Sequence, residues 1–218
     1  MRNIGKNLPL IVSALIVSFT IAVLTASIAT NHPFDIIFVE DTSASAIADK
    51  RFDDFRDSLC KVIFPNGLNS NQNSFIHIFY AESVNTTGQW SSQRKCPLEK
   101  PDKLSTEKGT DPASAIDRAL QMLADRPKNT KPLVLFSIHA DENHEDAEGR
   151  NKLLQSVQKL ISNIKEKNGK IIIFAGYYEK LRDYLEKEIK DKGSIFYCPY
   201  GKLENQGMSC SADELIAG

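Results

Sequence analysis

The hydrophobic pattern beyond residue 33 alternates between short apolar runs and longer amphipathic segments. The short runs are bounded by polar turn residues and predict strands; they span residues 34–41, 74–80, 132–138, 170–175 and 194–198. The longer segments repeat apolar side chains every three to four residues and predict helices; they span residues 46–64, 112–123, 145–167 and 178–190. This order predicts an α/β fold with a doubly wound, mostly parallel sheet and helices on both faces.

Local signals refine the element boundaries. Pro65-Asn66-Gly67 predicts the end of the first helix. Asp111 suits an N-cap and Pro112 the first position of the helix that follows. Residues 84–90 predict a short edge strand that pairs back on the second strand, and His77 inside that second strand is expected to be packed or solvated rather than a ligand.

The N-terminal region has a different pattern. Leu8–Ala29 contains no charged residue, and 22 helical residues span about 33 Å, enough to cross a bilayer. Arg2 and Lys6 precede the segment and no Lys or Arg follows until Lys50, which predicts a cytoplasmic N-terminus (residues 1–7) and an extracytoplasmic remainder. The alternative is a signal peptide cleaved after Ser27-Ile28-Ala29, although its apolar part would be unusually long.

One face of this predicted transmembrane helix carries small side chains at four-residue spacing. They are Ala14, Ser18, Ala22 and Ala26. Such a stripe allows close contact between membrane helices, so self-association is one interpretation. The other is that alanine and serine are simply tolerated there.

Composition limits the function classes. The chain has 218 residues, with 27 basic and 28 acidic side chains, so its overall charge gives no reason to expect a nucleic-acid partner. We expect one folded domain over residues 34–200 and a tail over residues 201–218.

All four cysteines follow the predicted membrane segment: Cys60, Cys96, Cys198 and Cys210. An extracytoplasmic compartment favours disulfides, and the spacing is not that of a zinc site. Four cysteines allow three connectivities. Pairing of Cys198 with Cys210 would close the shorter loop, and four reduced cysteines are the alternative.

Candidate chemistry lies where the first predicted strand ends. Asp41, Ser43 and Ser45 follow the apolar run directly and precede a helix. The carboxyl ends of strands are where open α/β sheets bind ligands. One carboxylate and two hydroxyls are hard oxygen ligands, which suit Mg²⁺ or Mn²⁺.

This stretch resembles the first strand and the Asp-x-Ser-x-Ser motif of von Willebrand factor type A (vWA) domains, in which the motif begins a metal-ion-dependent adhesion site. The resemblance covers residues 34–200. It implies that Thr110, in a Gly-Thr pair before a helix, supplies another hydroxyl. It also implies a bound Mg²⁺, or Mn²⁺ or Ca²⁺, whose coordination is completed by an acidic group of a partner protein.

The third arm of the site departs from the family pattern. The family has Asp-Gly directly after the strand, whereas this chain has His139-Ala140, followed by Asp141. Imidazole suits Zn²⁺ or Ni²⁺ better than Mg²⁺, but Asp141 could reach the ion directly or through water. The acidic residues from Asp141 to Glu148 form either a rim beside the site or the first turn of the next helix, where the helix dipole favours them.

Three functions remain open. The resemblance implies a membrane-anchored binding module for adhesion or protein assembly. A metal-free scaffold is the second. A hydrolase using Asp41, His139 and Ser43 or Ser45 is the third, although the chain contains no Gly-x-Ser-x-Gly and no glycine-rich phosphate loop.

Only residues 30–33 separate the membrane segment from the first strand, so we expect the candidate site to point away from the bilayer.

Overall fold

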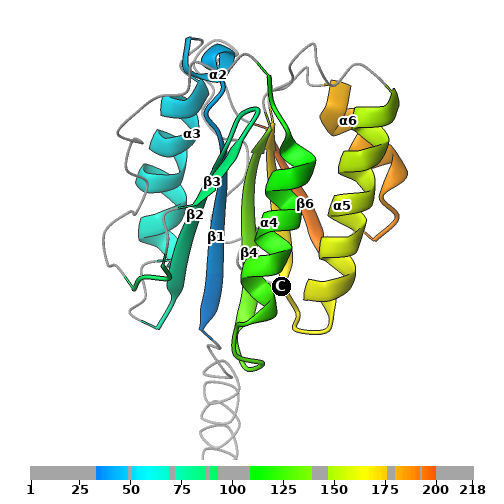
Figure 1. Ribbon diagram of the computed structural model, residues 1–218. Helices are drawn as coiled ribbons and strands as arrows, with labels where there is room; N and C mark the ends of the chain where they lie inside the picture. Colours follow the sequence, from blue (N-terminus) through cyan, green and yellow to red (C-terminus); the bar gives the residue numbers. More distant parts are fainter. Residues whose placement is uncertain are drawn as a thin grey trace, which may run out of the picture. The chain divides into compact units, whose positions relative to one another are not determined.

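The computed structural model describes residues 33–48, 51–68, 72–86, 89–92, 109–138, 147–175, 180–191 and 193–199. In these ranges strands and helices alternate along the chain (Figure 1). The strands are β1 (Phe34–Asp41), β2 (Ser74–Tyr80), β3 (Val84–Thr86), β4 (Lys131–Ile138), β5 (Lys170–Ala175) and β6 (Ile195–Pro199). The helices are α2 (Ala44–Ala48), α3 (Arg51–Ser58), the π-helix η1 (Leu59–Leu68), α4 (Pro112–Ala124), α5 (Ala147–Lys165) and α6 (Lys180–Glu188).

The six strands form one sheet in the order β3-β2-β1-β4-β5-β6. All neighbours are parallel except β2 and β3, which form an antiparallel pair at the edge. From β1 the chain proceeds to β2 on one side and later returns to β4 on the other. The change of direction makes the carboxyl end of β1 a topological switch point, where α/β sheets bind ligands.

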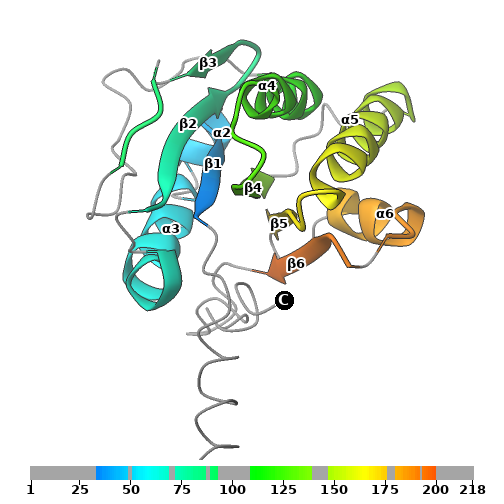
Figure 2. The same cartoon turned by 90° about the horizontal axis from the view of Figure 1, so that it is seen from below.

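Helices cover both faces of the sheet, as predicted. Figure 2 shows α4, α5 and α6 on one face and α3 on the other. Successive strand residues alternate between these faces: Ile37 and Val39 of β1 pack with α4 and α5, while Ile36 and Phe38 pack with α3 and η1. Hydrophobic side chains that lose contact with water on both faces provide the main stabilisation of such a central strand.

Two boundaries predicted from the sequence are wrong. The single helix expected over residues 46–64 is α2, α3 and η1, and it does not stop at Pro65 but continues to Leu68. The edge strand expected over residues 84–90 is shorter than predicted: β3 begins at Val84 and ends at Thr86. Further along the chain, Ser91 forms an isolated bridge with Phe75.

The remaining elements agree with the predictions within two residues at each end, and Asp111 is the N-cap of α4 with Pro112 in its first turn.

No helix in the described ranges is long and apolar enough to cross a membrane. The predicted segments 1–7, 8–29 and 201–218 lie outside those ranges, as does the stripe of small residues, so these interpretations stay predictions.

Two cysteines fall within the described part of the chain. Cys60 on η1 and Cys198 on β6 are both disulfide-bonded, and neither is a free thiol. Cys96 and Cys210 lie outside the described ranges, so the expected pairing of Cys198 with Cys210 stays a prediction.

At the amino end of the sheet, a buried ion pair closes the core. Asp35, at the start of β1, is 1% exposed and accepts hydrogen bonds from Thr130 and, at 2.5 Å, from Arg126. The Arg126 guanidinium also lies 4.2 Å from the ring centroid of Trp90. A buried carboxylate needs such partners, because without them its charge stays uncompensated. Removing one partner of a buried ion pair typically destabilises a protein by about 3–5 kcal/mol.

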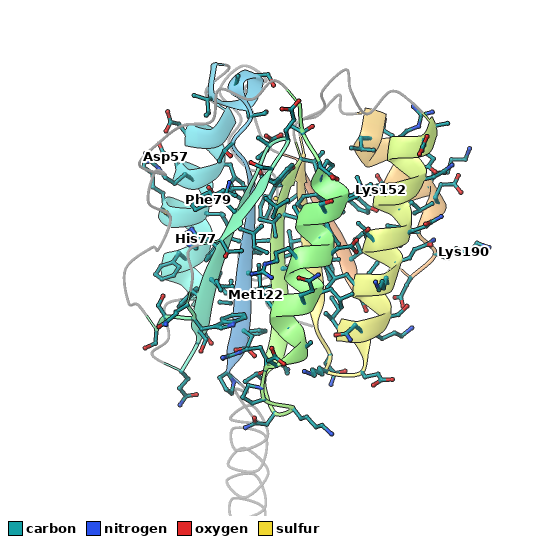
Figure 3. The ribbon with its side chains drawn as sticks, in the orientation of Figure 1. Asp57, His77, Phe79, Met122, Lys152 and Lys190 are labelled. Atoms are coloured by element: carbon teal, nitrogen blue, oxygen red, sulfur yellow. The ribbon has the colours of Figure 1, made fainter. Side chains whose placement is uncertain are left out.

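His77 is packed, which is one of the two states expected for it from the sequence. Its ring lies 5.0 Å from that of Phe38 and 5.7 Å from that of Phe79. Figure 3 shows His77 and Phe79 on β2. Burial among these rings lowers the pKa of His77 to about 4, because desolvation disfavours the imidazolium.

We predict that His77 destabilises the protein as the pH falls. Below pH 6.5 the unfolded chain takes up a proton that folded His77 does not take up until about pH 4. The free energy of unfolding should therefore drop through this window by up to about 3 kcal/mol. In His77→Phe this component should vanish. Urea denaturation at a series of pH values should therefore show that, from pH 6.5 to 4, the free energy of unfolding falls less in the variant than in the wild type. Parallel stability curves would contradict the prediction.

Candidate metal centre

The candidate residues Asp41, Ser43 and Ser45 lie at the switch point of the sheet. Asp41 is the last residue of β1, with β2 on one side and β4 on the other. It is 1% exposed and Ser43 is fully buried, whereas Ser45 is exposed. The three side chains thus lead from the buried end of the strand to the protein surface.

The loop geometry brings the hydroxyl groups together. The Ser43 amide donates a hydrogen bond of 2.8 Å to Oδ1 of Asp41, which folds the loop back over the end of β1. The hydroxyl oxygens of Ser43 and Ser45 are then 3.2 Å apart. Two adjacent ligands of an octahedral Mg²⁺, each about 2.1 Å from the ion, would be separated by about 3 Å. The spacing and the oxygen chemistry of this set therefore fit a small divalent cation.

A hydrogen-bonded clamp holds this loop between its neighbours. The carbonyl of Tyr80, at the end of β2, accepts hydrogen bonds from the amide of Thr42 at 2.8 Å and from its hydroxyl at 3.2 Å. The Tyr80 hydroxyl donates to the carbonyl of Ser137 at 2.6 Å. The Asp41 amide donates to the hydroxyl of Ser137 at 3.2 Å. Tyr80 and Ser137 thus join the ends of β2, β1 and β4.

The second arm of the candidate site meets the same end of β2. The Asp111 amide donates to the carbonyl of Ala81 at 2.7 Å, which brings the Gly109–Asp111 segment to the strand end that also holds Thr42. Thr110 is half-buried there. Gly109 suits this position, since a Cβ atom would lie only 2.7 Å from Cγ of Glu82.

Asp111 itself binds the helices rather than the loop of Asp41. Its carboxylate accepts bonds from the Ser114 amide (3.0 Å), the Ser114 hydroxyl (2.6 Å) and the Lys152 ammonium (3.2 Å). Burial raises the pKa of Asp111, but the bonds from Ser114 and the Lys152 ammonium outweigh that effect and leave the pKa below its usual range. Asp111 therefore fixes the start of α4 and connects it to α5.

The third arm cannot be compared with the other two, because His139 and Asp141 lie outside the described ranges. In those ranges no three His, Cys, Asp or Glu side chains gather as a metal-binding group. The set that the structure brings together consists of one carboxylate and two hydroxyls, with Thr110 on the adjacent segment. Whether His139 or Asp141 joins them stays a prediction.

Sequence reasoning missed Glu40. Its side chain is fully buried, and neither carboxylate oxygen has a hydrogen-bond partner among the described residues. Burial raises the pKa of Glu40 to about 8, although the charge of Arg56 opposes the rise. Burial thus favours the uncharged form of this carboxyl group. The available signal was an acidic residue within an apolar run, immediately before Asp41.

Comparisons with known proteins identify the fold. No family model and no curated protein matches the chain. Among solved structures, the chain resembles the VWA domain of SpRpn10, with a TM-score of 0.57 and 15% identity over 76% of this chain and 86% of that chain. It also resembles mussel byssus proximal thread matrix protein 1 with a zinc-occupied MIDAS motif (TM-score 0.53, 12% identity, 84% of this chain, 45% of that chain). A third similar structure is that of the manganese-loaded TRAP protein of Plasmodium vivax (TM-score 0.51, 12% identity, 78% of this chain, 69% of that chain).

The chain has the vWA fold. At 12–15% identity these likenesses establish the fold alone, and the chain spans less than half of the mussel protein. They confirm the fold class expected from the order of elements and from the motif at Asp41. Metal binding, partners and location are matters for the proposal below.

We predict that Tyr80→Phe weakens the clamp. The change removes the hydroxyl bonded to the Ser137 carbonyl and leaves a buried acceptor without its donor, which should lower the free energy of unfolding by about 1–2 kcal/mol. Urea denaturation in the presence of a chelator measures this loss. Tyr184→Phe is the matched control, because it removes an exposed bond to Asn151 and should change stability by less than about 0.5 kcal/mol. Equal effects would refute a special role for Tyr80.

Proposed function

We propose that this protein is a membrane-anchored vWA-like module that binds partner proteins outside the cytoplasm through a divalent metal ion. The observation that carries the proposal is the convergence of Asp41, Ser43 and Ser45 at the carboxyl end of β1. The neighbours with manganese or with zinc in a MIDAS motif support it, since they show that this fold can hold such ions.

In this proposal Asp41, Ser43, Ser45 and Thr110 hold the ion, with His139 or Asp141 completing the protein ligands. Mg²⁺ is the expected ion, and Mn²⁺ or Ca²⁺ are alternatives with the same preference for oxygen. The bound ion would supply a positive charge with an open coordination position for an acidic group. The protein itself holds the loop in place. The hydrogen bond from the Ser43 amide to Asp41 keeps the hydroxyls of Ser43 and Ser45 close together, and Tyr80 joins the ends of β2 and β4 through its bond to Ser137.

Basic side chains also lie near the second arm. Lys152, near the start of α5, binds Asp111 beside Thr110 and still has a side chain that is 56% exposed. Arg150, half-buried in the same turn, lies 5.8 Å from the ring centroid of Tyr184. Asp111 balances the charge of Lys152, so these side chains would supply hydrogen-bond donors to an acidic partner without making the surface strongly positive.

Two features support membrane anchoring and an extracytoplasmic location. The uncharged segment Leu8–Ala29 follows Arg2 and Lys6, the pattern of an anchor with a cytoplasmic N-terminus. Cys60 and Cys198 are disulfide-bonded, which is typical of an oxidising compartment. In this arrangement the chain enters β1 from the membrane side, and the site at the far end of the strand faces outward.

A metal-free scaffold is the second candidate function. The observation that favours it is His139 at the position where the vWA pattern has an aspartate. Loss of that carboxylate would weaken a Mg²⁺ site, and the fold would then act through packing surfaces alone. The two functions differ in whether metal stabilises the protein.

We predict that Mg²⁺ or Mn²⁺ raises the melting temperature (Tm) of the full-length protein in detergent after removal of bound metal. At ten times the Kd the rise should be about 3–6 °C. In Asp41→Asn it should disappear, because the substitution keeps the side chain's shape but removes the charge that holds the ion. Differential scanning fluorimetry across a metal titration is the measurement.

Asp57→Asn provides the control for this titration. Asp57 is an exposed carboxylate on α3 that binds Lys61 (Figure 3), and its loss should leave the metal-dependent rise intact. No rise in the wild type would favour the scaffold. A rise that persists in Asp41→Asn would mean that metal binds elsewhere and that the ligand assignment is wrong.

A further inference from the structure

The amino end of the sheet carries two lysines that form no ion pair with any residue in the described part of the chain. Lys131, the first residue of β4, is half-buried, and Lys170, the first residue of β5, is 8% exposed. The Lys170 ammonium is buried and makes no hydrogen bond within the described ranges. Its Nζ lies 5.0 Å from the ring centroid of Phe196. A buried cation without an anion is costly, so this position requires an explanation.

The two lysines belong to one face of the sheet. Lys170 is opposite Leu133 in the register of β4 and β5, and Lys131 precedes Leu133 by two residues, so both side chains lie on the face covered by α3 and η1. One strand spacing and two residues separate their Cα atoms by about 8 Å. Desolvation first, and then the charge of Lys131, lower the pKa of Lys170. Two like charges therefore act on each other where no described carboxylate neutralises them.

Aromatic side chains flank the lysines on the same face. Phe34 lies opposite Lys131 in the neighbouring strand β1, and Phe196 of β6 lies opposite Ile172, two residues after Lys170. Both rings are only partly buried. Near the amino ends of β1, β4, β5 and β6, which Figure 2 views from below, Phe34, Lys131, Lys170 and Phe196 thus form a diagonal row, in which Lys170 and then Phe196 each lie two residues further along the sheet. Surfaces that combine Phe with Lys are found where proteins contact the membrane interface.

The chain enters the domain beside this row. The carbonyl of Pro33 accepts a hydrogen bond of 2.9 Å from the Lys131 amide. Only residues 30–33 lie between β1 and the uncharged segment Leu8–Ala29, and four extended residues reach at most about 14 Å. If that segment is the anchor of the proposed function, on which this inference rests, the connection limits how far Pro33 and the adjacent Lys131 can lie from the bilayer surface.

We propose that Lys131 and Lys170, flanked by Phe34 and Phe196, form a binding site for the phosphate of an anionic phospholipid headgroup. The Lys170 ammonium lies just under the surface at the end of a flexible stem and rotates toward the edge to meet the phosphate beside Lys131. The headgroup supplies the missing counter-charge, and the rings contact the interface on either side. The site would hold the domain upright on the membrane, with Asp41 directed away from it.

The test compares full-length protein in nanodiscs of phosphatidylcholine alone with nanodiscs that also contain phosphatidylglycerol. Binding of the anionic headgroup should raise the Tm by about 2–4 °C, and high salt should reduce the rise. Lys131→Gln/Lys170→Met should lose it. The variant should still fold, because methionine keeps the apolar stem against Phe196 and removes a buried charge. Lys159→Gln/Lys187→Gln removes the same charge from exposed positions on α5 and α6 and should retain the rise.

A second readout reports the distance to the lipid. Trp90 is the only tryptophan of the chain and lies at this end of the sheet, against Arg126. Energy transfer from Trp90 to dansyl-labelled headgroups should be stronger in the anionic nanodiscs, and the Lys131/Lys170 variant should lose that increase while the control retains it. A structural role of the lysines alone would not change the transfer.

The outcomes separate this inference from the proposed function. Protein that fails to enter nanodiscs would refute the anchor itself. Protein that enters them but has equal Tm and equal transfer in both lipids would refute the headgroup site alone, as would a rise retained by Lys131→Gln/Lys170→Met. An equal rise with inorganic phosphate in neutral detergent would show that the site takes free phosphate rather than a lipid.

Discussion

The central position of β1 is the constraint on which the rest of the structure depends. β1 pairs with β2 on one side and with β4 on the other, and its side chains enter both hydrophobic clusters. Its end at Asp41 is then fixed by hydrogen bonds from the neighbours rather than by the loop alone: Ser137 binds the Asp41 amide and Tyr80 binds Thr42. A loop held from both sides can keep its hydroxyls in a fixed arrangement, which is what a binding site for a small ion requires.

Ionisable groups inside this core differ in how they are accommodated. Asp35 is paired with Arg126 and Thr130, and the pair closes the amino end of β1. Glu40 and Lys170 have no hydrogen-bond partner among the described residues. Burial raises the pKa of Glu40 and lowers that of Lys170, so each favours its uncharged form. Buried groups without partners lower stability, and these two lie near opposite ends of their strands.

The two ends of the sheet therefore offer different chemistry. The carboxyl end presents a carboxylate and hydroxyls from the loop after β1, with Thr110 nearby. The amino end presents lysines and aromatic rings. Parallel strands make this separation possible, because all four central strands begin at one edge and end at the other. A module that binds a partner at one end and rests on a membrane at the other would need this polarity.

The sequence by itself determined the order of elements, the parallel sheet and the placement of Asp41, Ser43 and Ser45 after the first strand, because apolar periodicity and capping residues are local signals. Asp111 and Pro112 marked the start of α4 in the same way. The sequence did not reveal the continuation of η1 through Pro65, since that depends on a helical pitch with no local signature. Only the tertiary structure decided that Tyr80 and Ser137 hold the loop, that Glu40 is buried, and that Lys131 and Lys170 share a face. Each of these results from strand order and register, which bring together residues that lie far apart in the chain.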